Sequence, residues 1–161
     1  MTPDREQAPI RAVMTRSGAL SLYIAIIAIG NLVWEFLQLP LYTIWKTGTL
    51  GEQAFAVLHC TLGDVLIAAS TLATSFILVG DRRWPWRRSW PVISFTIFTG
   101  LAYTVFSEWL NVDVRATWAY SEWMPVLRMF GLSIGLTPLL QWVVVPAAAF
   151  AITSKKIANK K

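Results

Sequence analysis

Long blocks of apolar residues, and not an alternation of apolar and polar positions, dominate this chain. A helix needs about 20 mostly apolar residues to cross the roughly 30 Å hydrocarbon core of a bilayer. Four stretches meet this requirement: 17–38, 55–80, 92–110 and 132–153. The pattern predicts an all-α fold, an integral membrane four-helix bundle in which residues 1–161 form one transmembrane domain.

Composition agrees with this class. Of the 161 residues, 55% are apolar and 14% are charged, whereas soluble domains carry about 25% charged residues. The single cysteine, Cys60, excludes an internal disulfide and leaves the redox compartment open. Arginines precede the first apolar block, as in a signal peptide, but the block is too long for one and lacks a cleavage site. We interpret it as an uncleaved span.

The distribution of the basic residues predicts the orientation. With four spans, the N-terminus, the loop between spans two and three, and the C-terminus share one side of the membrane. That side holds 11 of the 14 basic residues, namely Arg5, Arg11, Arg16, Arg82, Arg83, Arg87, Arg88, Lys155, Lys156, Lys160 and Lys161. The opposite side has Lys46, Arg115 and Arg128. Because positive residues concentrate in cytoplasmic loops, both termini are predicted to be cytoplasmic, in a plasma membrane of the bacterial inner-membrane type.

The basic run 81–90 interleaves arginine with tryptophan, a composition that can bind single-stranded nucleic acid. A tight loop lying in the lipid headgroup layer has the same composition, with Trp84, Trp86 and Trp90 as interface anchors. We favour the second interpretation, which makes the lipid bilayer the partner of this surface and excludes nucleic acid.

Three of the nine acidic residues, Glu35, Asp64 and Glu108, fall inside or at the ends of spans. A carboxylate at the centre of a span costs about 2.5–3.5 kcal/mol on insertion scales, so it indicates a functional site. The simpler alternative is that Glu35 and Glu108, near helix ends, reach headgroup water. Asp64 lies deeper by roughly 10 Å, at about 1.5 Å per residue, which makes it the strongest candidate.

Helical spacing gathers the polar residues into one stripe on each span. The stripes are Asn31, Glu35 and Gln38; Cys60, Asp64, Thr71 and Ser75; Gly100, Thr104, Ser107, Glu108 and Asn111; and, on the fourth span, Gln141. Polar stripes turn away from lipid and toward one another, although small and amide side chains also serve simply in helix packing. The stripes predict a polar pocket that opens to the outer side.

The candidate catalytic residues are therefore Asp64, Glu108 and Glu35. The candidate substrate-binding residues are Asn31, Gln38, His59, Asn111, Trp118 and Gln141. His59 belongs near the mouth of the pocket but about 140° around the helix from Asp64, outside its stripe.

A long aromatic outer loop, residues 111–125, is expected between the third and fourth spans. Its aromatic residues, including Trp118 and Trp123, fit either an aromatic belt in the outer interface or a lid over the pocket, with Arg115 or Asp113 facing the carboxyl groups. We favour the lid. The fourth span is expected to contain Gly131 and Gly135 at the spacing that permits close helix approach, followed by two prolines that free backbone carbonyls.

Few reaction types are indicated. The chain has no Gly-rich phosphate loop and no paired-cysteine metal site, and its one histidine excludes bis-histidine haem ligation within the chain, though His59 can supply one ligand. Three carboxyl groups and a histidine could bind a divalent metal, and this alternative stays open. Metal sites in four-helix bundles normally use Glu-x-x-His pairs, which are missing here, so no metal ligands are predicted. The sequence names no cofactor.

Carboxyl groups in an apolar site can stay protonated at neutral pH, so Asp64 or Glu108 can serve as a general acid on an isoprenoid or another lipid double bond. The faces of Trp34, Trp109 and Trp118 would stabilise the positive charge. The same pocket could instead bind a quinone-like molecule or move protons, and the sequence leaves open whether the protein is an enzyme. The alternative from another class is a non-catalytic membrane subunit, a homo-oligomer or the partner of a larger complex.

Overall fold

The computed structural model describes residues 4–81, 84–85, 89–129 and 131–158, and it is mostly helical. The elements are α1 (Asp4–Gln38), the 3-10 turn η1 (Leu39–Leu41), α2 (Ile44–Thr47), α3 (Leu50–Val79), α4 (Trp90–Glu108), the π-helix η2 (Trp109–Val114), β1 (Val126–Met129), β2 (Leu132–Gly135) and α5 (Leu136–Ala158). The predicted basic residues Arg82, Arg83, Arg87, Arg88, Lys160 and Lys161, and Trp86, lie outside the described residues.

Four of these helices are long and apolar enough to cross a membrane, as the sequence predicts. Their membrane-spanning segments are Arg16–Leu41, Leu50–Val79, Trp90–Val114 and Leu136–Lys156. Many large apolar side chains on them face outward, Leu66, Ile77 and Phe98 among them. Outward apolar surface on every span is what a lipid environment requires. The molecule is a membrane-embedded helical bundle.

The second span begins five residues before its predicted start because its N-terminus is capped. The Thr49 hydroxyl accepts a hydrogen bond from the Glu52 N–H at 3.3 Å, and the Glu52 carboxylate accepts one from the Thr49 N–H at 2.8 Å. This reciprocal capping box satisfies backbone donors that would otherwise lack partners. The helix can therefore start within a polar segment that hydropathy alone does not count.

The predicted start of the fourth span at residue 132 is wrong. Residues 132–135 form β2, which pairs antiparallel with β1, with Leu132 opposite Met129 and Gly135 opposite Val126. Gly131 sits in the turn with φ +79°, a conformation that glycine adopts without strain. Gly131 and Gly135 therefore belong to a β-hairpin and not to a helix face, and the bundle carries this small sheet in addition to its helices.

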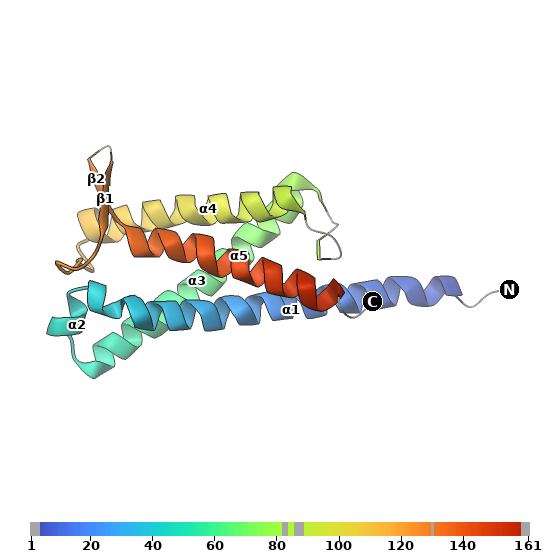
Figure 1. The fold of residues 1–161 in the computed structure, drawn as a ribbon, viewed down its shortest axis with the longest axis horizontal. Coiled ribbons are helices and arrows are strands. Elements are labelled where there is room, and N and C mark those ends of the chain that lie inside the picture. The colour runs from blue at the N-terminus through green and yellow to red at the C-terminus, as the bar shows by residue number, and fades with distance from the viewer. Residues whose placement is uncertain (1–3, 82–83, 86–88, 130, 159–161) are drawn as a thin grey trace.

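The four long helices form a ring in which α1 packs on α3 and α5, and α4 packs on α3 and α5 (Figure 1). The α2 helix and the β-hairpin lie at one end of the bundle, here called the hairpin end. The start of α1 and the end of α5 lie at the other, here called the termini end. Both ends of the chain thus lie at the same end of the bundle, as four spans require.

Glycines let α5 approach two of its neighbours closely. A Cβ added at Gly30 of α1 would lie 2.8 Å from Val145, and one at Gly100 of α4 would lie 2.2 Å from the Trp142 ring. Both distances are far below a normal contact, so these α1–α5 and α4–α5 contacts need glycine.

An aromatic cluster forms the core at the termini end. The Trp84 ring is fully buried, with ring centroids at 6.0 Å from Tyr23, 5.7 Å from Phe76 and 5.8 Å from Phe150. The prediction that Trp84 is an interface anchor is therefore wrong, because its ring fills the space between α1, α3 and α5. Trp90, in contrast, is largely exposed at the start of α4.

Candidate functional site

A cavity of about 940 Å³ occupies the hairpin end of the bundle, between α3 and α4 and against α1 and α5. Eight of the nine predicted site residues line it: Glu35, Gln38, His59, Asp64, Glu108, Asn111, Trp118 and Gln141. The ninth, Asn31, is buried behind them and hydrogen-bonds to Gln141. Part of each predicted polar stripe therefore meets at this site, whereas Thr71, Ser75 and Gly100 of the stripes do not line the cavity.

Gln141 of α5 connects the buried polar groups of α1 and α3. Its Nε2 lies 3.0 Å from Asn31 Oδ1, 3.0 Å from Glu35 Oε1 and 2.8 Å from Asp64 Oδ2. An amide nitrogen carries two hydrogens, and here it faces three acceptor oxygens. The amide therefore cannot donate a full hydrogen bond to all three at once, and another donor is needed in this cluster.

Glu35 and Asp64 have further donors besides Gln141. Gln38 donates to Glu35 at 2.9 Å and also to Gln141 Oε1 at 3.3 Å. The Trp142 side chain interacts with Asp64 from α5, and the carboxyl groups of Glu35 and Asp64 are near enough to interact with each other. Amide and indole groups thus hold two neighbouring carboxyl groups beside the cavity.

Glu108 is held from a different direction. The Tyr120 hydroxyl donates a hydrogen bond to the Glu108 carboxyl and accepts one from the Gly135 N–H at 2.8 Å. Glu108 is also near enough to Glu35 and Asp64 for their charges to interact. The position of this third carboxyl therefore depends on the β-hairpin, through Tyr120.

Two tyrosines outside the spans share this environment. Tyr120 forms a β-bridge with Tyr42, and the two ring centroids are 5.7 Å apart. Burial raises the pKa of Tyr42 well above its ordinary value, and the charges of Glu108 and Glu35 raise it further. The pKa of Tyr120 is also raised, first by burial and then by its hydrogen bond to Glu108. Both hydroxyls are therefore protonated at neutral pH.

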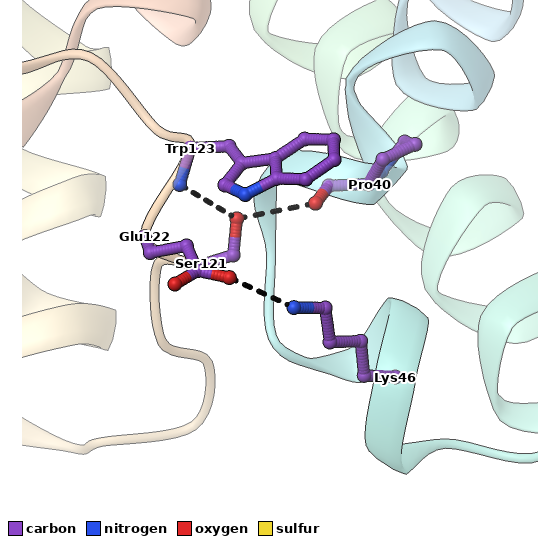
Figure 2. Close-up of polar contacts among 5 residues, drawn as sticks. All are labelled: Pro40, Lys46, Ser121, Glu122 and Trp123. Atoms are coloured by element: carbon purple, nitrogen blue, oxygen red, sulfur yellow. Dashed lines mark hydrogen bonds and ion pairs between the residues drawn. The ribbon is translucent and has the colours of Figure 1, made fainter.

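The outer loop is joined to the segment after α1 by a set of bonds, here called the loop clamp. The Thr43 N–H donates to the Ala119 carbonyl at 2.9 Å, and the Ser121 N–H donates to the Leu41 carbonyl at 2.8 Å. Figure 2 shows its side-chain part. The Ser121 hydroxyl donates to the Pro40 carbonyl at 3.1 Å, and Lys46 Nζ lies 3.0 Å from a Glu122 carboxylate oxygen.

Two residues of the loop between η2 and β1 line the cavity: Trp118, which is partly buried, and Arg115, which is exposed. Asp113 and Trp123 are exposed and do not line it. Figure 2 places Trp123 beside the loop clamp, where its backbone N–H donates to the Ser121 hydroxyl at 3.3 Å. Trp118 thus lies at the cavity and Trp123 on the surface of the loop.

The aromatic residues at the cavity differ in part from those expected. Trp34 packs against the core cluster, and neither it nor Trp109 lines the cavity. Tyr42, Tyr103 and Trp142 line it instead. His59 also lines it, and its ring stacks on Phe55 with centroids 5.5 Å apart. Trp142 directly follows the predicted Gln141, but the role of Tyr120 depends on the hairpin, which has no signal in hydropathy.

Within the part of the chain that the structure describes, no three His, Cys, Asp or Glu side chains are grouped so that they could hold a metal ion. The chain matches no protein-family model, and neither the curated proteins nor the solved structures include one with significant similarity to it.

Proposed function

We propose that this protein binds a lipid-soluble molecule, isoprenoid- or quinone-like, in the cavity at the hairpin end, and that its carboxyl groups act on that molecule as acid and base. The observation that carries the proposal is the juxtaposition of Glu35, Asp64 and Glu108 at one cavity inside a membrane-embedded bundle. Buried carboxyl groups without a basic partner are costly in a bilayer, so a function that needs them is the simplest reason for their presence.

The cavity suits a ligand with a large apolar body. Its volume lies in the range of about 300–1,000 Å³ that is typical of small-molecule sites. Apolar and aromatic side chains such as Phe55, Ile67 and Tyr103 form its walls beside the carboxyl groups. Such a mixture, mostly apolar with a few converging polar groups, orients a ligand by its polar end and excludes water from the reacting atoms.

The proposed reaction is a double-bond rearrangement. A proton carried by Glu35 or Asp64 adds to one carbon of a lipid double bond, which leaves a carbocation on the other carbon. Glu108 then removes a proton from a neighbouring carbon, and the electrons of that C–H bond form the new double bond. The product is an isomer of the substrate, no co-reactant is consumed, and the proton returns from Glu108 to the pair.

The cavity can stabilise the charged intermediate of this reaction. The faces of Tyr103, Trp118 and Trp142 border the cavity and attract positive charge through the ring quadrupole. A carboxylate in the same low-dielectric space contributes more, since it neutralises the charge directly. If the ligand is quinone-like, the same proton donors would instead bind its carbonyl oxygens, and the protein would be a binding protein.

The alternative is a non-catalytic subunit whose polar stripes hold a partner or further copies of the chain. The hydrogen bonds from Gln141 to Asn31, Glu35 and Asp64 favour the cavity proposal, because these stripe residues bond to one another within one chain. The orientation proposed here has both termini cytoplasmic and the cavity toward the outer side of a bacterial inner membrane. Arg16, Lys155 and Lys156 at the termini end support it through the positive-inside rule.

The proposal is tested by solvent-deuterium incorporation. Protein in lipid nanodiscs, with the lipid-soluble molecules that copurify with it, is incubated in D₂O, and the extracted molecules are analysed by mass spectrometry. The wild type is expected to add deuterium, whereas Asp64→Asn and Glu108→Gln are expected to bind the same molecules without adding it.

Asp113→Asn is the matched control, because Asp113 is exposed and does not line the cavity. It should exchange as the wild type does. Bound molecules that gain no deuterium in the wild type would exclude the acid step and leave the binding role. The absence of any bound molecule would contradict the whole proposal.

A further inference from the structure

The α3 and α4 helices are in contact toward the termini end and separate toward the hairpin end. At the termini end, Ser75 Oγ and Thr96 Oγ1 are 2.7 Å apart and both are buried. Toward the hairpin end, Figure 1 shows α3 running away from α4 and crossing toward α1. The cavity lies between the separated halves, lined by His59 and Gly63 of α3 and by Tyr103 of α4.

Gly63 shows how open this wall of the bundle is. A Cβ added there would meet no atom within 4 Å, whereas one at Gly30 or Gly100 would overlap a side chain of α5. The α1 and α5 helices are therefore in close contact at Gly30, and α4 and α5 are in close contact at Gly100. Between α3 and α4 there is open space at Gly63, which lines the cavity.

The edges of this opening are apolar and face outward. Phe55 on α3 is 69% exposed and Tyr103 on α4 is 46% exposed, although both line the cavity. Both residues belong to helices that are long and apolar enough to cross a membrane, so their exposed faces are suited to lipid. At the hairpin end, the loop clamp joins the two connecting segments through backbone hydrogen bonds, and the exposed residues Thr47, Glu52 and Thr117 line the cavity there. The cavity thus has an apolar edge between α3 and α4 and a polar edge at the hairpin end, and an apolar ligand matches the first.

We propose that the ligand enters and leaves sideways, from the bilayer, through the opening between α3 and α4 bordered by Phe55 and Tyr103. The inference rests on the proposed function for the identity of the ligand, but the opening itself can be tested without a ligand. It implies a substrate that resides in the membrane and never has to dissolve in water, which restricts the class to molecules with a long or polycyclic apolar body.

Cys60 is a natural reporter for this route, because it lines the cavity and is the only cysteine in the chain. Protein in liposomes is treated with two methanethiosulfonates, a benzyl reagent that dissolves in the bilayer and a trimethylammonioethyl reagent that stays in water. Each transfers its own thiol group to the thiolate, forming a mixed disulfide, and releases methanesulfinate. Because the reaction type is the same, the local reactivity of Cys60 cancels when the two rates are compared. Each rate is normalised to the rate on the denatured chain.

The benzyl reagent is expected to modify Cys60 at least about tenfold faster than the charged reagent, because desolvating a quaternary ammonium costs far more than the ~1.4 kcal/mol that a tenfold rate represents. If water reached the cavity, its carboxyl groups would attract the positively charged reagent and accelerate its reaction. A slower reaction of that reagent is therefore not explained by repulsion. Tyr103→Ala should widen the opening and accelerate the benzyl reagent alone. Phe98→Ala, at another exposed aromatic residue of α4 that does not line the cavity, should leave both rates unchanged.

A charged reagent that keeps pace with the benzyl reagent would show an aqueous route and overturn the inference. So would a Cys60 that neither reagent modifies, or equal effects of the Tyr103 and Phe98 substitutions. These outcomes concern the route only. The binding of copurified molecules to the same preparation decides the proposed function separately.

Discussion

The amide nitrogen of Gln141 lies 2.8 Å from Oδ2 of Asp64, so a residue of the last span holds the carboxyl group of the second. The same nitrogen contacts Glu35 and Asn31 of the first span. One side chain therefore joins three of the four helices at the depth of the cavity. Because Asn31, Asp64 and Gln141 are buried and Glu35 is partly buried, breaking the network leaves polar atoms without partners in a low-dielectric site.

Replacing Gln141 by leucine is expected to destabilise the bundle substantially. Each buried polar group left without a partner costs about 1–3 kcal/mol, and the substitution affects Asn31, Glu35 and Asp64 together. Thermal unfolding in detergent measures the effect. Thr153→Val is the control on the same helix, because the buried Thr153 hydroxyl has no hydrogen-bond partner and its loss should be neutral or slightly stabilising. Equal melting temperatures for the two variants would argue against the network.

Tyr120→Phe is expected to lower stability by about 1–3 kcal/mol, since it removes the donor to Glu108 and the acceptor of the Gly135 N–H. Tyr103→Phe, on the exposed edge of the cavity, should change the melting temperature little when no ligand is bound. The melting temperature of Tyr120→Phe is also measured in a Glu108→Gln background, which tests the pairing of Tyr120 with Glu108. If Tyr120 stabilises the protein through Glu108, Tyr120→Phe must lower the melting temperature less in that background than in the wild type.

Stability is expected to fall as the pH rises above about 10. The pKa values of Tyr42 and Tyr120 are raised in the folded protein, so in this range the folded state keeps two protons that the unfolded chain releases. A state that binds more protons is disfavoured as the pH rises, so their contribution is complete below pH 10 and is lost above it. Unfolding midpoints between pH 8 and 11 measure the slope, which Tyr42→Phe should reduce. A midpoint that rises with pH over this interval would contradict the assignment.

Three of the helical glycines, Gly18, Gly63 and Gly100, should respond to a larger side chain with different signs. Gly63→Leu and Gly18→Leu are each expected to stabilise their helices by about 0.8 kcal/mol, because leucine has the higher helix propensity and both sites have open space. Gly100→Ala has the same propensity advantage but must displace the Trp142 ring, so it should destabilise. Melting temperatures of the three variants decide this. A stabilised Gly100→Ala would mean that α4 and α5 are farther apart than described.

The spans and the cavity residues could be predicted from sequence because each depends on local spacing. About 20 apolar residues identify a helix that crosses the membrane, and Glu35, three residues before Gln38, must share a face with it. The convergence of the four stripes followed from the exclusion of polar groups from lipid. This rule placed Asp64 and Gln141 at one site without any knowledge of how the helices pack.

The remaining features depend on contacts between distant segments. Trp84 lies in a basic run whose composition is typical of a membrane interface. Only its packing against Tyr23 and Phe150 reveals it as a core residue. The sequence of β2 is predicted to belong to the fourth span because Leu132 and Ile134 are apolar. A strand of four residues is too short to show a periodic pattern that distinguishes it from a helix. The bond from Tyr120 to Glu108 could not be predicted because the hairpin positions it.

Native mass spectrometry of the protein purified in a mild detergent tests the central claim most directly. The wild type and Gly18→Leu should each retain a lipid-soluble molecule at a ratio of one per chain. Gly63→Leu should lose it, because the added side chain projects into the open space beside the cavity while the fold is retained. A wild type that carries no bound molecule, or a Gly63→Leu variant that binds it as well as Gly18→Leu does, would contradict the claim that this cavity is a ligand site.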